Sequence, residues 1–204
     1  MEEARGGMCN KTLEYYNQNA ASFVQGTRNV DFTDTQEKFL RVLRGKKVLD
    51  FGCGSGRDAK YFMEAGLEVT AIDGSEELCK IASAYTGIPV RQMLFQEFNE
   101  VNEYDGIWAC SSILHLPKGE LKSVFLKMIR ALRKNGVIYT SFKYGDFEGE
   151  RNGRFFTDFT EETFDDFMKD LEEIVIEEQW ITGDVRPGRE EEKWLNLLLR
   201  KTCF

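Results

Sequence analysis

The residues with the clearest chemical potential form segment 48–59, which reads VLDFGCGSGRDA. An apolar run ends in Asp50, and three glycines then occupy every second position, namely Gly52, Gly54 and Gly56. Glycine lets backbone approach a ligand where any Cβ would intrude. The next apolar run, VTAID, ends in Asp73, whose carboxylate can accept hydrogen bonds from both hydroxyls of a ribose. This pattern predicts a site for a nucleoside cofactor.

The spacing of these glycines distinguishes the loop from two other nucleotide-binding loops. A dinucleotide-binding loop has the pattern G-x-G-x-x-G, and Arg57 stands where its third glycine would fall. The sequence also lacks the phosphate loop G-x-x-x-x-G-K-[ST]. The loop is therefore a poor fit to NAD or FAD, although an NAD-dependent oxidoreductase is kept as an alternative.

With these features in place, the chain resembles the class I S-adenosylmethionine-dependent methyltransferases of the small bacterial single-domain type. Their first motif is similar to VLDFGCGSG, and an acid ends their second strand as Asp73 does here. Later parts of such enzymes resemble, in the same order, WACSSILHLPK (108–118), LRKNGVIYTSFK (132–143), RFFTDFTEE (154–162) and WLNLLLRK (194–201). The resemblance implies S-adenosylmethionine as methyl donor, S-adenosylhomocysteine as product, and methyl transfer by in-line displacement.

The resemblance also implies which residues surround the cofactor. The glycine loop would face its amino-acid part and Asp73 its ribose, although Asp73 could instead cap the following helix. Many relatives place an acid near the adenine where this chain has Leu94 and Phe95, so their backbone, or the side chains of residues 96–97, would replace it. The expected cofactor-binding residues are Tyr16, Asp50, Gly52, Cys53, Gly54, Gly56, Arg57, Asp73, Gly74, Ser75, Leu94, Phe95, Ala109, Cys110 and Ser111.

Three of the expected site residues have alternative interpretations. Tyr16, with Tyr15, resembles a tyrosine pair of a lid helix over the cofactor, or it is a buried contact of an amphipathic helix. Arg57 could pair the cofactor carboxylate or form a surface salt bridge. His115, the sole histidine, is the candidate catalytic base because imidazole has an unperturbed pKa near ~6.5. A structural histidine that bonds backbone is the favoured interpretation.

The acceptor side is expected on the loops after the fifth strand and before the last one. Its candidate residues are Lys143, Tyr144, Arg154 and Arg186, accompanied by Arg151, Phe156 and Arg189. The arginines could receive an anionic substrate through bidentate hydrogen bonds, but solvated arginines that balance nearby acids are the favoured interpretation. GCGSGRDA also resembles the glycine loop of tellurite-resistance and related thiol methyltransferases, so a soft nucleophile is one candidate acceptor. Oxygen and nitrogen acceptors remain open.

Length, charge and composition narrow the class of protein. The 204 residues predict a single domain, 1–204, with N-terminal lid helices in 1–45 and the core in 46–204. A net charge of −8 favours a small-molecule acceptor and makes nucleic acid unlikely. The absence of a long apolar run, of a secretory signal and of paired cysteine spacing predicts a cytoplasmic protein without membrane association, a disulfide framework or a metal site. We expect a monomer or weak homodimer; a non-catalytic cofactor-binding module is a further alternative.

Strand and helix patterns alternate along the chain after residue 46. They predict an α/β fold, Rossmann-like and doubly wound, with a mostly parallel seven-stranded sheet, helices on both faces and an N-terminal helical lid. One helix should run from Pro117 to Asn135-Gly136, and another should begin after Thr160. Residues 144–157 and 183–192 are expected to be loops. The expected strands lie near 46–51, 67–72, 89–94, 104–110, 136–143, 173–183 and 193–201.

Overall fold

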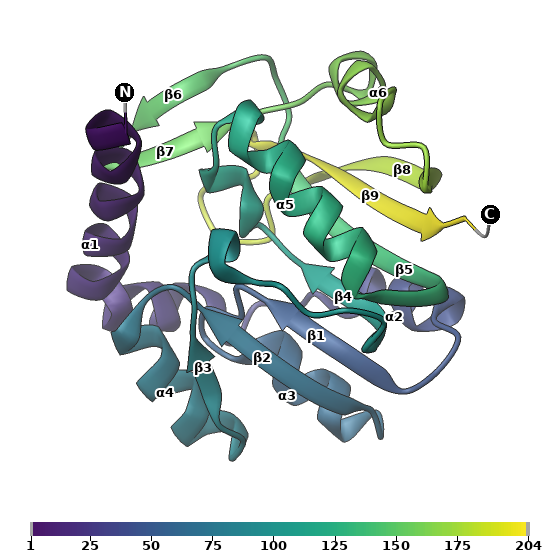
Figure 1. Cartoon of the computed structure of the whole chain (residues 1–204). Helices are drawn as coiled ribbons and strands as arrows, with labels where there is room; N and C mark the ends of the chain where they lie inside the picture. Colours follow the sequence, from purple (N-terminus) through teal and green to yellow (C-terminus); the bar gives the residue numbers. More distant parts are fainter. Residues whose placement is uncertain (1, 203–204) are drawn as a thin grey trace.

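A computed structural model describes residues 2–202, and the side chains of residues 11–202 (Figure 1). Seven strands form a sheet in the order β3-β2-β1-β4-β5-β9-β8. They are β1 (Lys47–Phe51), β2 (Glu68–Asp73), β3 (Val90–Gln92), β4 (Tyr104–Ala109), β5 (Leu132–Lys143), β8 (Ile174–Gly183) and β9 (Lys193–Lys201). β9 pairs antiparallel with β5 and β8, and the remaining pairs are parallel. The predicted fold class is confirmed.

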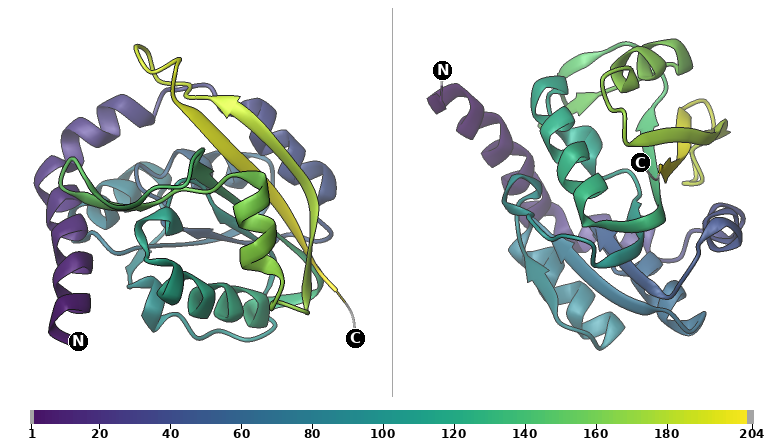
Figure 2. Two further views of the ribbon diagram at one scale, coloured as in Figure 1. Left: turned by 90° about the horizontal axis from the view of Figure 1, so that it is seen from above. Right: turned by 45° about the vertical axis from the view of Figure 1, so that its right-hand side comes forward.

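Helices cover both faces of this sheet (Figure 2). They are α1 (Glu2–Thr27), α2 (Thr33–Val42), α3 (Arg57–Glu64), α4 (Glu76–Thr86), α5 (Lys118–Ala131) and α6 (Glu161–Met168), with short 3-10 turns η1 (Phe95–Glu97) and η2 (Ile113–His115). Successive strand residues point to opposite faces. Leu49 of β1 thus joins the buried cluster of Val124 and Phe164, while Val48 joins that of Phe62. Strands that are apolar and buried on both faces are typical of a mostly parallel sheet covered by helices.

The strand order reverses next to β1. This strand pairs with β2 on one side and with β4 on the other, so the loops that leave β1 and β4 diverge at their carboxyl ends. In open α/β sheets such a divergence leaves a crevice in which ligands bind. The glycine loop follows β1 directly, so the topology places it at that crevice.

Helix α1 stands across this end of the sheet, beside α4 and the strand β7 (Arg154–Thr157) (Figure 1). Two hydrogen bonds fix it there. The Ser75 hydroxyl donates to Asn17 Oδ1 at 2.6 Å, and the Phe155 amide donates to Thr12 Oγ1 at 3.1 Å. The N-terminal helix that the sequence predicts therefore lies where a lid would have to lie.

The prediction of a loop over residues 144–157 is wrong. The segment forms a hairpin of β6 (Glu148–Arg151) and β7. Asn152 and Gly153 connect the two strands with φ angles of 50° and 76°. An Asn-Gly pair favours such a two-residue turn because both positions need positive φ. The dipeptide was thus a hairpin signal that the polar composition of the segment obscured.

The predicted end of α5 at Asn135-Gly136 is also wrong. The helix ends at Ala131, and Leu132 is already extended, with φ −70° and ψ 139°. Leu132 pairs with Tyr104 at the start of β5. Strand pairing therefore overrides the apolar helical periodicity that continued through Leu132.

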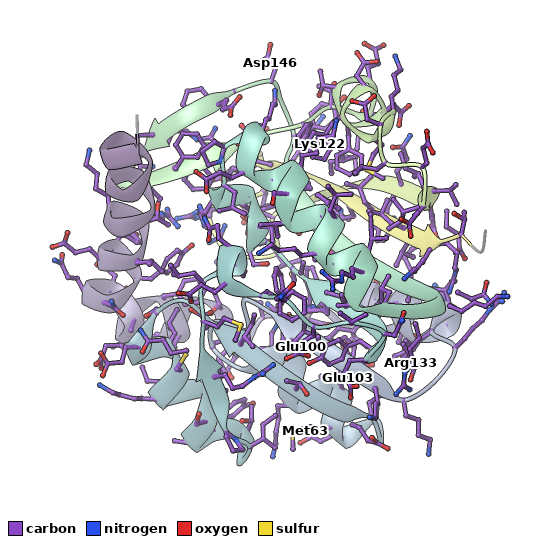
Figure 3. All side chains as sticks on the ribbon, in the orientation of Figure 1. Met63, Glu100, Glu103, Lys122, Arg133 and Asp146 are labelled. Atoms are coloured by element: carbon purple, nitrogen blue, oxygen red, sulfur yellow. The ribbon has the colours of Figure 1, made fainter. Side chains whose placement is uncertain are left out.

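The amino-terminal ends of the strands carry exposed ion pairs. Lys47 Nζ lies 2.8 Å from Glu103, and Arg133 lies 3.4 Å from Asp105. Figure 3 shows Glu103 and Arg133 near one another at this edge of the molecule. The Lys47–Glu103 pair is exposed on both sides, and such pairs contribute little to stability. Both pairs lie at the opposite end of the strands from the glycine loop.

Within residues 2–202, every helix is too short or too polar to cross a bilayer. Among the side chains of residues 11–202, no group of three His, Cys, Asp or Glu could hold a metal ion. Cys53, Cys79 and Cys110 are free thiols, and the side chains of Cys9 and Cys203 lie outside the described residues.

Candidate active site

A cavity lies at the carboxyl ends of β1, β2 and β4, beneath α1. It brings together most of the predicted site. The predicted cofactor residues in its lining are Tyr16, Gly52, Cys53, Gly54, Arg57, Asp73, Gly74, Leu94, Phe95, Cys110 and Ser111. From the predicted catalytic and acceptor sets, the lining includes His115, Lys143, Arg154, Phe156, Arg186 and Arg189. The residues predicted for the cofactor and those predicted for the acceptor therefore line one continuous cavity.

Residues 52–55 of the glycine loop form one wall of the cavity, and two of them, Gly52 and Gly54, have no side chain. Gly52 has φ +88°, and a Cβ there would lie 2.5 Å from Cβ of Ser112. Gly54 has φ +53°, and its Cβ would lie 3.0 Å from the ring of Phe23 in α1. Both positions combine a left-handed backbone with close approach, so another residue would be strained and crowded. Bare backbone at the wall is what a tightly held ligand requires.

Asp73 is the last residue of β2 and is buried. Its Oδ2 accepts from the Gly54 amide at 2.9 Å, and its Oδ1 accepts from the Ser75 amide at 2.8 Å. Burial raises the pKa of Asp73, and these amides oppose that effect. Ser75, not Asp73, caps α4 through a hydrogen bond from the Leu78 amide. Each carboxylate oxygen keeps acceptor capacity for a ligand hydroxyl.

Six residues of the predicted site lie outside the lining of this cavity: Asp50, Gly56, Ser75, Ala109, Tyr144 and Arg151. Ala109 is fully buried in the core of the sheet. Gly56 is the N-cap residue of α3 and has φ +77°. A Cβ there would meet Thr86 of α4 at 3.0 Å, so this glycine lets α3 and α4 approach each other. Tyr144 is exposed and lies at a neighbouring outer cavity. Ser75 is buried as the α4 cap described above.

Asp50 lies beneath the loop and is buried. Burial, followed by the charge of Asp58, raises the pKa of Asp50 well above its usual range. Its Oδ2 has no hydrogen-bond partner in the described part of the chain. The structure thus places this carboxyl outside the lining of the cavity, where it accepts a hydrogen bond from the Ala59 backbone in α3.

Arg57 lines the cavity but is held by a neighbour. Its Nε and Nη2 each donate to the Asp58 carboxylate at 2.8 Å. Gln36 and Trp108 also donate to Asp58, at 2.7 and 2.9 Å. Because this buried network uses the guanidinium fork, the salt-bridge interpretation of Arg57 has the stronger geometric support, although the bridge is not on the surface.

His115 and Tyr16 connect the lid helix to the body of the protein. The carbonyl of Phe155 can only accept, so His115 Nδ1 carries the proton and donates to it at 2.6 Å. The other ring nitrogen, Nε2, then accepts from the Tyr16 hydroxyl at 2.8 Å. Burial lowers the pKa of His115 to about 4. With both nitrogens occupied and a low pKa, His115 is better suited to hold Tyr16 than to take a proton.

This low pKa predicts a pH-dependent contribution to stability. Between about pH 4 and about pH 6.5 the unfolded chain binds a proton at His115 that the folded chain does not. The free energy of unfolding should therefore fall as the pH drops from about 7 to about 5, by up to about 2 kcal/mol. Denaturant unfolding at the two pH values should show a smaller fall for His115→Gln. Equal falls in both proteins would mean that His115 titrates as in water.

Most cations at the acceptor end are neutralised locally. Lys143 hydrogen-bonds to Glu192, which lies 3.7 Å from Arg189 as well. Arg186 Nε donates to Asp184 at 2.8 Å. Arg151, which lies outside this cavity, pairs with Asp158 at 2.6 Å. These contacts agree with the favoured interpretation of arginines balanced by acids. Arg154 is the exception, because its buried Nε has no hydrogen-bond partner in the described part of the chain.

Several lining residues were not predicted from the sequence. From the lid they include Thr12, Leu13, Phe23 and Thr27, and from the strands Ser141, Trp194 and Asn196. The apolar periodicity of α1 was visible, but which side faces a cavity was not. Ser141 and Asn196 interrupt the apolar runs of β5 and β9. A polar residue inside an otherwise apolar strand could therefore have indicated a position that faces the cavity.

Comparisons with known proteins agree with this site. Residues 48–136 match the sequence profile of a methyltransferase domain. The ubiquinone biosynthesis O-methyltransferase of Proteus mirabilis is 32% identical over 106 residues, which cover 48% of this chain and 42% of that protein. The chain spans about half the length, or less, of the curated relatives it matches.

Solved structures share the fold at low sequence identity. The 1,6-didemethyltoxoflavin-N1-methyltransferase of Burkholderia thailandensis, solved with S-adenosylhomocysteine, has a TM-score of 0.76 at 20% identity and covers 98% of this chain and 91% of its own. The [4+2]-cyclase SpnF has a TM-score of 0.67 at 15% identity, over 84% and 80% of the two chains. The fold alone thus does not determine the reaction. Together with the profile match, these similarities show that the chain contains a methyltransferase domain with the fold of the class I S-adenosylmethionine-dependent methyltransferases.

Proposed function

We propose that this protein is an S-adenosylmethionine-dependent methyltransferase that transfers the donor methyl to a small-molecule acceptor. One observation carries the proposal: the bare glycine loop and Asp73 meet at the strand-order reversal, in a cavity that continues to a polar acceptor end. The methyltransferase-domain match over residues 48–136 supports it.

The cavity residues fit the cofactor by their chemistry. Gly52 and Gly54 line the cavity, and the close approach of their backbone to Ser112 and Phe23 excludes a side chain at either position. Asp73 has acceptor capacity for the ribose hydroxyls, and Leu94 and Phe95 offer apolar surface to the adenine. When bound, the cofactor supplies a methyl group on a sulfonium, which is already activated for displacement.

The protein's own contribution is binding, alignment and exclusion of water. Two titratable side chains at the expected methyl end are poorly suited to proton removal. His115 uses both ring nitrogens, and burial raises the pKa of the Cys110 thiol to about 12. An acceptor that arrives as a competent nucleophile needs only orientation, which by itself can supply a large part of a rate enhancement.

Calorimetric titration with S-adenosylhomocysteine tests the cofactor assignment. We expect the protein to bind S-adenosylhomocysteine, and NADH not to compete. The spacing of the glycine loop, with Arg57 at the third dinucleotide position, is the reason for this selectivity. Binding of NADH without binding of S-adenosylhomocysteine would contradict the proposal and favour an oxidoreductase.

Turnover has to be tested separately because the same fold serves other reactions. A screen of small acceptors, followed through release of S-adenosylhomocysteine, should yield at least one methylated product. Cofactor binding with no release across carboxylate, phenol, amine and thiol acceptors would indicate a non-catalytic binding module.

A further inference from the structure

The acceptor end of the cavity has more positive than negative side chains. Its cations are Lys143, Arg154, Arg186 and Arg189. Among the described side chains two acids pair with them: Asp184 binds Arg186, and Glu192 is shared by Lys143 and Arg189. In a chain of net charge −8, this local surplus of positive charge is a specific feature of the site.

Arg154 is the source of much of that surplus. Among the described side chains, no carboxylate lies within 4.0 Å of Arg154, and its buried Nε has no hydrogen-bond acceptor. Its one hydrogen bond to a side chain, from Nη1 to the Tyr16 hydroxyl, is long at 3.4 Å. A buried N–H donor without an acceptor costs free energy, which a ligand oxygen would recover.

Aromatic rings hold this guanidinium in place. Its carbon lies 4.5 Å from the ring centre of Tyr15, 5.7 Å from that of Tyr16 and 5.1 Å from that of Phe156. Stacking leaves the edge of the planar guanidinium available for in-plane hydrogen bonds. A fork fixed in this way loses little further entropy when it binds a carboxylate.

The position of Arg154 separates it from the cofactor end. It lies on β7 and lines both the main cavity and the outer cavity, whose lining also includes Tyr144, Asn152 and Lys193. The lining of the outer cavity contains no residue of the glycine loop or Asp73. A ligand group at Arg154 would therefore come from the acceptor side.

We infer that Arg154 binds a carboxylate on the methyl acceptor, and that the acceptor is a small molecule with a carboxylate on a flat, apolar body. The unpaired guanidinium supplies the recognition of the carboxylate, and Phe156 with the lid tyrosines supplies the apolar surface. This inference rests on the proposed function, since it names the acceptor class of the same site.

Benzoate is a suitable probe, with benzamide as its neutral analogue. Each is titrated by NMR into the full chain, with and without saturating S-adenosylhomocysteine. We expect wild type to bind benzoate with a dissociation constant on the order of millimolar and benzamide at least about tenfold more weakly. Arg154→Met should weaken benzoate binding by about tenfold or more, and Arg154→Lys, which keeps the charge but not the fork, by less.

The matched control is Arg133→Met. Arg133 lies at the amino-terminal edge of the sheet, and its side chain is 40% exposed (Figure 3). Its substitution by Met removes the same charge as Arg154→Met. It should leave benzoate binding unchanged, which excludes an effect of net charge. Thermal unfolding of each variant checks that the fold is retained. If Arg154→Met does not fold, benzoate binding is compared between wild type and Arg154→Lys.

The outcomes separate this inference from the proposed function. Failure of wild type to bind benzoate, equal binding of benzamide, or equal affinity in the Arg154 variants would overturn the inference. A tenfold loss of S-adenosylhomocysteine affinity in Arg154→Met would instead assign Arg154 to the cofactor carboxylate and also overturn it. If wild type binds benzoate as expected but no S-adenosylhomocysteine, the carboxylate site stands and the proposed function fails.

Discussion

Asp73→Ala is expected to weaken S-adenosylhomocysteine binding by about 100-fold, or about 3 kcal/mol. The carboxylate is buried, accepts from the Gly54 and Ser75 amides, and is the proposed acceptor for the ribose hydroxyls. Hydrogen bonds to a charged group contribute about 1.5–3 kcal/mol each, and the variant also leaves two amides without their acceptor. Calorimetric titration of folded protein measures the loss.

A second variant at Asp73 and a control at an exposed aspartate test whether the loss of affinity is specific to the Asp73 carboxylate. Asp73→Asn preserves the shape but must turn an NH₂ group toward one of the two amide donors, so its affinity should also fall, by a smaller factor. Asp170→Asn removes an exposed carboxylate that hydrogen-bonds to Lys122, and it should bind as wild type does. An Asp73→Ala protein that folds and keeps wild-type affinity would disprove the ribose assignment.

Gly52→Ala is expected to lower the free energy of unfolding by about 2–4 kcal/mol and to weaken S-adenosylhomocysteine binding at least about tenfold. The new Cβ would have φ +88° and lie 2.5 Å from Ser112 Cβ and 3.0 Å from the Phe95 ring. Ser112 cannot move freely, because its hydroxyl donates to the Phe51 carbonyl at 2.6 Å. The loop must therefore shift, which alters the cavity wall. Denaturant unfolding and calorimetry measure the two effects.

Gly66→Ala separates backbone strain from crowding. Gly66 has a similar φ of +84°, but a Cβ there would meet no atom within 4 Å. Its cost should be the left-handed backbone alone, about 1–2 kcal/mol, without any change in cofactor affinity. If Gly52→Ala loses no more stability than Gly66→Ala and binds equally well, the close approach at Gly52 has no functional role.

Features that depend on neighbours in the sequence were predictable. The parallel sheet followed from the alternation of apolar runs and amphipathic segments, and the structure confirms its seven strands. The α6 cap at Thr160 was readable because a cap bonds residues three positions away. The β6–β7 hairpin was readable in principle from Asn152 and Gly153, but the polar composition of the segment led to a loop assignment.

Features that depend on distant partners were not predictable. The setting of Arg154 is one of them: its guanidinium packs on Tyr15 and Tyr16 of α1, and its Nε has no hydrogen-bond partner among the described residues. The pairing of His115 with Tyr16 joins residues 99 positions apart. Such contacts depend on how α1 and the hairpin pack over the sheet, which no local pattern encodes.

The sequence by itself identified the glycine loop and Asp73, which line one end of the cavity. Backbone conformation and short-range spacing build that end, so the glycines and Asp73 were legible as residue types. The tertiary structure alone decided that Arg154 has no acid partner among the described side chains and that His115 bonds Tyr16 and the Phe155 carbonyl, because these contacts join segments that folding brings together.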